Sequence, residues 1–219
     1  KPTDQYKLYP GILKYLYPKQ IHNLSKRDVL EFQASLVVKG VSRSYQNQSI
    51  NAIKFYLERV LGYDRQVFKL ERPKRESRLP VVLSKNEISL ILDQISNLKH
   101  KAIISTIYGT GIRISELQRL SLADIDSDTM RIWVRGGKGN KDRITLLSDN
   151  LLSLLRSYYR VYKPKKWLFE APNGKEYSTS SIRKILHRAC KKARIQKHVT
   201  VHTLRHSFAT HLMESGVNL

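Results

Sequence analysis

The segment VHTLRHSFATHL, residues 201–212, holds an imidazole and a guanidinium at a spacing that suits a phosphate site. His202 and Arg205 lie three residues apart. Apolar residues at helical spacing predict a helix that begins near Thr203 and ends at Gly216, which suits the position after a C-cap. A helix N-terminus attracts anions, and an arginine adds a two-pronged donor. Histidines near a helix are also common as surface or core residues, so this segment alone leaves both interpretations open.

A second candidate is Arg113, in the segment GTGIRISEL at residues 109–117. The two glycines allow backbone or ligand to approach closely. We expect Arg113 just inside a short helix and on the same face as Glu116, whose carboxylate can hold the guanidinium in place. The alternative is an ordinary surface ion pair, worth roughly a few tenths of a kcal/mol.

The segment GKGNKDR, residues 137–143, places three basic side chains, Lys138, Lys141 and Arg143, on and beside a predicted hairpin turn. A lysine there can reach into a groove, and with a lowered pKa it could donate a proton to a leaving alkoxide. Taken alone, the segment favours the alternative of a solvated turn that makes general phosphate contacts.

The sequence does not favour nucleotide hydrolysis or metal chemistry. It contains no GxxxxGK[ST] motif, and its histidines do not form an HExxH motif. Two-metal nuclease chemistry needs several carboxylates at one site, and few acids stand near the histidines before Glu214. We therefore expect a mechanism that uses positive charge and neither a metal nor another cofactor.

The charge balance points to a polyanionic partner. Lys and Arg number 40 against 18 acids, a formal net charge of +22, and residues 156–197 hold 13 of these bases against two acids. Nucleic acid is the commonest such partner. No apolar run approaches the roughly 18 residues of a membrane span. The only cysteine, Cys190, excludes an internal disulfide, fits a reducing cytosol and is expected to pack in a helix.

The chain predicts two domains. Residues 73–80 belong to a charged stretch with two prolines that is typical of a linker, so the expected domains are 1–72 and 81–219. The first shows helical patterns only, and the second shows helices with a small antiparallel sheet, an α+β arrangement. The elements expected are helices at 26–40, 44–61, 85–95, 101–108, 113–117, 150–161 and 180–194, and strands at 130–135 and 143–147.

The order of the three segments, GxRxxEL, a GKG hairpin and HxLRH, resembles the tyrosine recombinases. This phage-integrase family includes Xer-type enzymes and many mobile-element integrases. The resemblance covers essentially the whole chain. It implies a helical, SAM-like core-binding domain over residues 1–72 and a catalytic domain over 81–219.

The resemblance implies a role for each candidate residue. Arg113 and Arg205 would bind the non-bridging oxygens of the scissile phosphate and stabilise the transition state. Lys138 would be the general acid for the 5′-hydroxyl leaving group. His202 would assist proton transfer or bind the phosphate, and Glu116 would support the arginines. Such enzymes form a 3′-phosphotyrosyl link without metal or ATP, and four identical protomers exchange strands between paired double-stranded DNA sites.

The sequence departs from the family at its end. Members continue with a further helix, a Gly-His or Gly-Trp segment and the nucleophilic tyrosine, whereas all 12 tyrosines here precede His202. We therefore expect a truncated form in which no residue is the nucleophile, so that these 219 residues bind DNA without cleaving it.

The basic composition also fits two other classes of function. A non-catalytic DNA-binding or architectural factor would explain the charge, but it has no reason to combine a lysine and an imidazole with two arginines. A basic RNA-binding protein is less favoured, because no aromatic-rich strand of the RNA-recognition type is present. For an enzyme of this family we expect a cytoplasmic, nucleoid-associated location in a bacterium. Further DNA contacts are expected from Arg43, Lys54, Lys141, Arg143 and Arg183.

Overall fold

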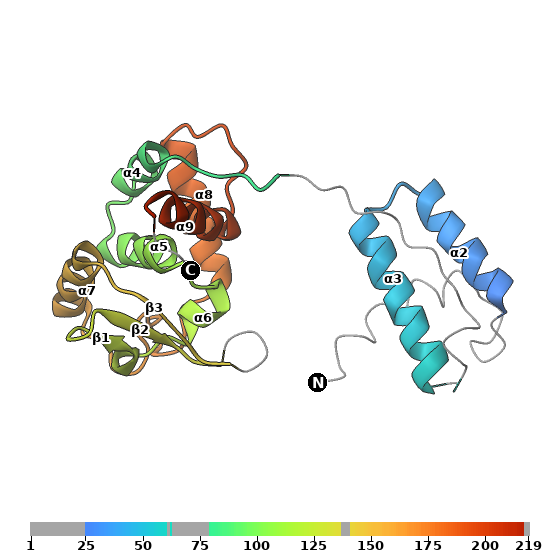
Figure 1. Cartoon of the computed structure of the whole chain (residues 1–219), viewed down its shortest axis with the longest axis horizontal. Helices are drawn as coiled ribbons and strands as arrows, with labels where there is room; N and C mark the ends of the chain where they lie inside the picture. The colour runs from blue at the N-terminus through green and yellow to red at the C-terminus, as the bar shows by residue number, and fades with distance from the viewer. Residues whose placement is uncertain (1–24, 61, 63–78, 137–140, 217–219) are drawn as a thin grey trace. The chain divides into compact units, whose positions relative to one another are not determined.

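The computed structural model describes residues 25–60, 62, 79–136 and 141–216. Contacts divide the chain into two compact units, Lys1–Arg78 and Leu79–Leu219 (Figure 1). Most of the expected linker lies outside the described residues. Its last two residues, Leu79 and Pro80, are exposed and belong to no helix or strand.

The described part of the first unit is helical. It consists of α2 (Lys26–Val38), α3 (Arg43–Phe55) and a π-helical turn, Tyr56–Val60, that continues α3. The predicted capping box at the start of α2 is present, since Ser25 and Asp28 bond to each other's backbone N–H groups. A small apolar core joins α2 to α3 and the turn, formed by Val29, Phe32, Leu36, Ile50, Ile53 and Leu57.

The second unit is mostly helical with one small sheet, as expected. Its elements are α4 (Lys85–Asp93), α5 (Leu98–Thr110), α6 (Ile114–Gln118), a 3₁₀ turn (Leu122–Asp124), β1 (Ile125–Asp126), β2 (Arg131–Val134), β3 (Arg143–Leu146), α7 (Asp149–Tyr162), α8 (Thr179–Lys192) and α9 (Val201–Glu214).

The sheet is antiparallel in the order β1-β2-β3. Its β2–β3 hairpin was predicted, and the alternation along β2 is clear: Ile132 and Val134 are buried, whereas Arg131 and Trp133 are exposed. The third strand, β1, was not predicted, because a strand of two residues is too short to show alternation.

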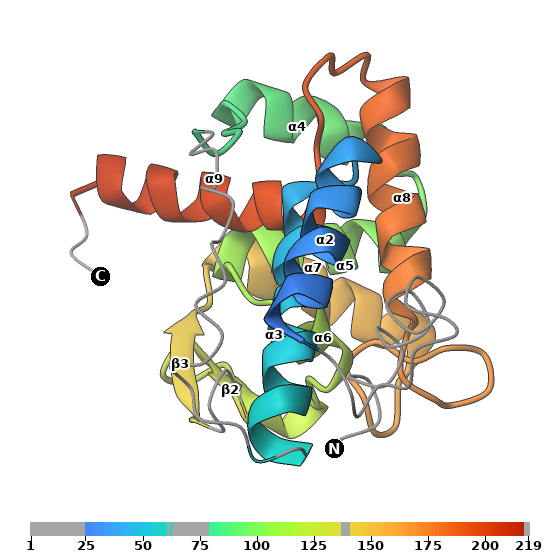
Figure 2. The same ribbon diagram turned by 90° about the vertical axis from the view of Figure 1, so that its right-hand side faces the viewer.

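The core of the second unit is built around α5, whose Ile103 and Ile107 are fully buried. This helix packs against α7, α8 and α9. In Figures 1 and 2, α4 lies at one end of the unit and the sheet at the other, with α5 and α9 between them. Cys190 is buried in this core, as predicted, and burial raises the pKa of its thiol to about 11.

The boundaries of α5 and α9, the helices that carry the candidate site, differ from the prediction. Helix α5 begins at Leu98, before the expected residue 101, because the Asn97 side chain accepts a hydrogen bond from the backbone of His100. It also continues through residue 109 and ends at Thr110, with Gly111 as its C-cap. Helix α9 begins at Val201 because Thr200 caps it, so His202 lies within its first turn.

Within the part of the chain that the structure describes, no helix combines the length and apolar character that crossing a membrane requires.

Candidate phosphate site

The turn between α5 and α6 is the centre of the candidate site. Gly111 ends α5 in the left-handed conformation, with φ +60°, and its N–H donates to the carbonyl of Ile107. A Cβ atom at this position would lie 2.4 Å from Cδ1 of Phe208 on α9. Of the natural residues, only glycine fits both this conformation and this contact without strain.

Arg113 directly precedes α6 as its N-cap, so it stands at the helix end rather than inside it as predicted. Its backbone N–H donates to Oε2 of Glu116 at 2.8 Å, and its Nη1 donates to Oε1 at 2.7 Å. Glu116 is buried, with 5% of its side chain exposed. The predicted pairing is therefore confirmed, and salt screens it less than a surface ion pair because the carboxylate is buried.

Glu116 also binds a second arginine. Nη2 of Arg143, at the start of β3, donates to Oε2 of Glu116 at 2.6 Å. Arg143 was expected only as a general DNA contact, and its partnership with Glu116 was not foreseen. No local spacing indicates this contact, because the two residues are 27 positions apart in the sequence.

Thr145 fastens β3 to the same turn. Its Oγ1 donates to the carbonyl of Thr110 at 2.8 Å. Oγ1 of Thr110 in turn donates to the carbonyl of Thr106, one helical turn earlier in α5. Two side chains of β3, Arg143 and Thr145, thus hold this strand against the segment that presents Arg113.

Arg205 reaches the turn from α9. Its Nη1 donates to the carbonyl of Gly111, two residues before Arg113. The structure therefore brings Arg205 to the segment that holds Arg113 and Glu116, as the family resemblance implied, and it adds Arg143 from a third segment. Such a group of guanidinium donors can bind the oxygens of a phosphate.

The charges of this group act on one another. Burial lowers the pKa of Arg205, and the positive charges of Arg113 and Arg143 lower it further, against the opposing effect of Glu116. Burial tends to raise the pKa of Glu116, but hydrogen bonds from Arg113 and the charges of Arg143 and Arg113 outweigh it and lower that pKa. The carboxylate thus stays ionised while positive charge remains in excess.

His202 is exposed in the first turn of α9, three residues before Arg205. Residues three apart on a helix are neighbours on one face. The imidazole therefore lies on the part of α9 that also carries Arg205, where it can reach a ligand from solvent.

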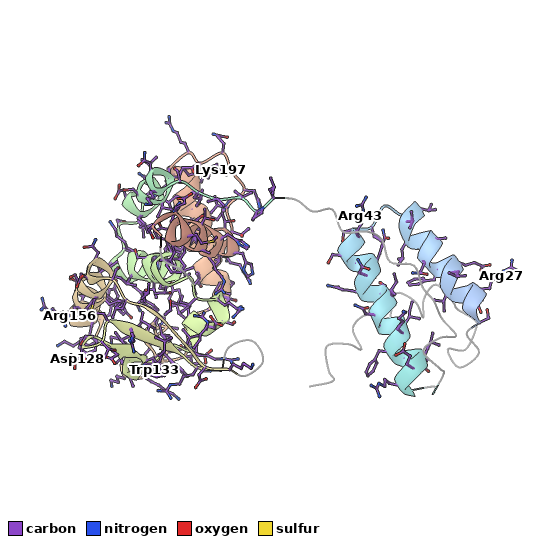
Figure 3. All side chains as sticks on the ribbon, viewed as in Figure 1. Arg27, Arg43, Asp128, Trp133, Arg156 and Lys197 are labelled. Carbon is purple, nitrogen blue, oxygen red and sulfur yellow. The ribbon has the colours of Figure 1, made fainter. Side chains whose placement is uncertain are left out.

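The remaining candidates are Lys138, Lys141, Arg183, Arg43 and Lys54. Lys138 lies outside the described residues. Lys141 is exposed in the loop that precedes β3, and Arg183 is exposed on α8. Arg43 and Lys54 belong to α3 of the first unit, and Figure 3 shows Arg43 at the N-terminal end of that helix.

A polar contact beside the site was missed. The hydroxyl of Tyr108 on α5 lies 2.9 Å from Nδ1 of His211 on α9, and burial raises the pKa of Tyr108. This pair links α5, which ends at the turn, to α9, which carries Arg205. Nothing in the local spacing indicates it, because the residues are 103 positions apart.

No group of three or more His, Cys, Asp or Glu side chains able to hold a metal occurs among the described residues. The guanidinium groups of Arg113, Arg143 and Arg205 are hydrogen-bond donors, and such donors bind anionic oxygen.

Comparison with known proteins decides the family. The model of the phage integrase family matches residues 81–219, more than half of the chain. The chain belongs to the phage integrase family. It is 38% identical over 204 residues to a putative integrase/recombinase, y4qK, of Sinorhizobium fredii. This match covers 90% of this chain and 65% of that protein. It is 36% identical over 223 residues to the tyrosine recombinase XerA of Pyrococcus horikoshii. That match covers 100% of this chain and 77% of that protein.

Solved structures of integrases and recombinases share the fold. A crystal structure of XerA recombinase matches 98% of this chain and 78% of its own with a TM-score of 0.60 and 31% identity. A lambda integrase tetramer bound to a Holliday junction matches 98% of this chain and 64% of its own with a TM-score of 0.79. That likeness, at 13% identity, shows the fold alone.

Proposed function

We propose that this chain is part of a site-specific DNA recombinase that breaks and rejoins strands through a 3′-phosphotyrosyl intermediate. The observation that carries the proposal is the meeting of Arg113 and Arg205 at the 110–113 turn, where both guanidiniums can bind the two non-bridging oxygens of one phosphodiester. The relatives named tyrosine recombinases support the same activity.

The proposed roles follow from position. Arg113 and Arg205 bind the scissile phosphate, and Glu116 orients Arg113. His202 bonds the phosphate or assists proton transfer from the attacking tyrosine. Lys138 donates the proton to the 5′-hydroxyl leaving group, a role based on its place in the GKG segment.

Double-stranded DNA is the proposed partner, and four copies of the complete enzyme are proposed to act on paired sites. The net charge of +22 supports a polyanion. Solved relatives include XerH bound to its difH substrate and the lambda integrase tetramer on a Holliday junction. The first unit is proposed as the core-binding domain, with Arg43 and Lys54 of α3 among its contacts, and Lys141 and Arg183 as contacts of the second unit.

The 219 residues are further proposed to bind DNA without cleaving it. The last of the 12 tyrosines is Tyr177, upstream of His202 and outside the context in which the family places its nucleophile. Of the tyrosines on α7, Tyr158 is fully buried, which leaves it unable to attack a phosphate.

The test begins with selection of bound duplexes from a random DNA pool by the 219-residue chain. The selected duplex is then incubated with two proteins, this chain and the protein expressed from its whole coding sequence, and denaturing gels are examined for covalent protein–DNA adducts. We expect an adduct with the second protein only. An adduct with the shorter chain overturns the binding-only proposal, and none with either favours a non-catalytic DNA-binding factor of the same fold.

The contribution of the first unit is tested with a matched pair of arginines. Arg43→Ala should weaken binding to the selected duplex about tenfold, the effect of one lost phosphate or base contact. Arg27→Ala is the control, because Arg27 is exposed on α2 and already pairs with Glu31 at 2.8 Å. Equal affinities of the two variants remove Arg43 from the contacts.

A further inference from the structure

Arg143 has a place in the site that its role as a general DNA contact does not explain. Two arginines share the single buried carboxylate of Glu116: Arg113 at 2.7 Å and Arg143 at 2.6 Å. One arginine is enough to neutralise a buried carboxylate, so the second needs another reason.

The same chain offers an internal comparison. Asp124, like Glu116, is a buried carboxylate three residues after the N-cap of a short helical segment, and it accepts a hydrogen bond from the N-cap backbone. A single arginine, Arg135, pairs with it at 2.7 Å. The purely structural version of this motif is therefore neutral, whereas the version at Glu116 carries one more positive charge.

Arg143 is also open to a ligand. About a third of its side chain, 32%, is exposed, which matches the 35% of Arg113. Arg143 contacts Glu116 through Nη2, and a guanidinium carries five N–H donors in a planar fork. Donors thus remain for an anion that enters beside Arg113.

The charges add up to a definite excess. Arg113, Arg143 and Arg205 contribute three positive charges and Glu116 one negative charge, which leaves two positive charges in excess. A phosphodiester carries a single negative charge. When an oxygen nucleophile loses its proton and attacks the phosphorus, the pentacoordinate phosphoryl group carries two negative charges until the leaving oxygen departs and takes up a proton. The site therefore matches the charge of the transition state better than that of the bound substrate.

We propose that Arg143 is a third phosphate-binding arginine, which with Arg113 and Arg205 forms a cradle that prefers a doubly charged phosphoryl group to a singly charged one. This inference rests on the proposed function, since it assigns a further residue and a charge preference to the same phosphate site. It makes Arg143 a contributor to catalysis in addition to affinity.

The test uses two small anions with the 219-residue chain, so it needs neither a DNA site nor a nucleophile. Inorganic phosphate, at a pH where it is mostly doubly charged, is compared with dimethyl phosphate, which is singly charged. Binding is followed by NMR through the Nε–Hε signals of the arginine side chains at constant ionic strength. Arg131→Ala is the matched control, because Arg131 is an exposed arginine of the adjacent strand β2.

We expect Arg143→Ala to raise the Kd for inorganic phosphate about tenfold and the Kd for dimethyl phosphate about threefold or less. Arg131→Ala should change either Kd by less than about twofold. In the unaltered protein, the Arg143 signal itself should shift when phosphate is added, a result that does not depend on any variant folding. Arg143→Lys keeps the charge but loses the planar pair of donors. Its Kd for inorganic phosphate should therefore lie between those of the unaltered protein and Arg143→Ala.

The outcomes separate this inference from the proposed function. If Arg143→Ala behaves like Arg131→Ala, Arg143 does not bind phosphate and the inference is wrong. If Arg143→Ala weakens the binding of both anions equally, the preference for a doubly charged group is wrong. If Arg113→Ala and Arg205→Ala nevertheless abolish phosphate binding in that case, the proposed function stands. If none of the three arginine variants changes phosphate binding, the phosphate site itself is wrong.

Discussion

Gly111 joins the local conformation of the chain to the phosphate site. Its left-handed backbone turns α5 toward Arg113, its carbonyl receives Arg205, and its missing side chain makes room for Phe208. We predict that Gly111→Ala lowers the free energy of unfolding by about 2 to 4 kcal/mol, because backbone strain and a steric clash act together. Urea unfolding followed by circular dichroism measures this change.

Gly174→Ala is the matched control for Gly111→Ala. Gly174 also has a positive φ, +72°, but a Cβ there meets nothing within 4 Å. This variant should lose only the strain contribution, about 1 kcal/mol. If the two variants lose the same stability, Phe208 does not constrain position 111 as the structure indicates.

Glu116 should make stability depend on pH. Its pKa in the folded protein is lowered, so its ionised form stabilises the fold above the ordinary carboxylate pKa, and this contribution is lost as pH falls through the lowered value. We predict that Glu116→Gln is less stable at neutral pH by about 2 kcal/mol and that the difference shrinks in acid. Urea unfolding at a series of pH values tests this.

Glu214→Gln is the control for the pH series, since Glu214 is exposed at the end of α9. Its stability curve should follow that of the unaltered protein. A difference between Glu116→Gln and the unaltered protein that stays constant down to strongly acidic pH contradicts the assignment, because it would mean that the lost contribution is not ionic.

At the scale of elements, α9 is held by the segment that opens the second unit. Ser207 is fully buried, and its Oγ accepts the N–H of Leu83 at 2.9 Å and donates to the carbonyl of Thr203 at 2.8 Å. We predict that Ser207→Ala costs about 1 to 3 kcal/mol, because the buried N–H of Leu83 loses its acceptor. Amide hydrogen exchange at Leu83 should become faster.

Ser215→Ala provides the comparison for Ser207→Ala. Ser215 makes a similar bond to the carbonyl of Leu212, but it is exposed, so water replaces the lost bond. This change should stay within about 0.5 kcal/mol. Unchanged exchange at Leu83 in Ser207→Ala would contradict the proposed tie between this segment and α9.

The elements differ in how well the sequence predicts them. Signals confined to a few residues succeeded: the capping boxes at Ser25 and Ser84 start helices where expected, and the alternation around Ile132 marks a real strand. The pairing of Arg113 with Glu116 belongs to the same class, because it joins the N-cap of α6 to a residue three positions later.

Contacts between distant segments could not be predicted in this way. The bonds of Arg205 to Gly111, of Thr145 to Thr110 and of Tyr108 to His211 span 94, 35 and 103 residues. Sequence spacing carries no information on which side chains meet after such a separation. The family resemblance assigned Arg113 and Arg205 to one site. Only the structure shows that Arg143 belongs beside them.

At the scale of the whole molecule, charge is the dominant property. The net charge of +22 includes bases in both units, such as Arg43 on α3 and Arg156 on α7, labelled in Figure 3. Most of these side chains cannot belong to the phosphate site, which uses only a few arginines. Their proposed task is to hold the DNA backbone on either side of the reacting phosphate, a contribution that depends on displacing cations from the DNA.

This task predicts a steep dependence of DNA affinity on salt. A protein that neutralises about six phosphates should show a slope on the order of −5 when log K is plotted against log salt concentration. Arg113→Ala should reduce the size of that slope by about 1, because one phosphate contact is lost. The neutral substitution Gln196→Ala, at an exposed position, should leave it unchanged. Fluorescence anisotropy with a labelled duplex over a series of KCl concentrations gives all three slopes. A slope no steeper than about −1 would mean that the excess charge is not used on DNA. The partner would then have to be sought among ligands that contact the phosphate site alone.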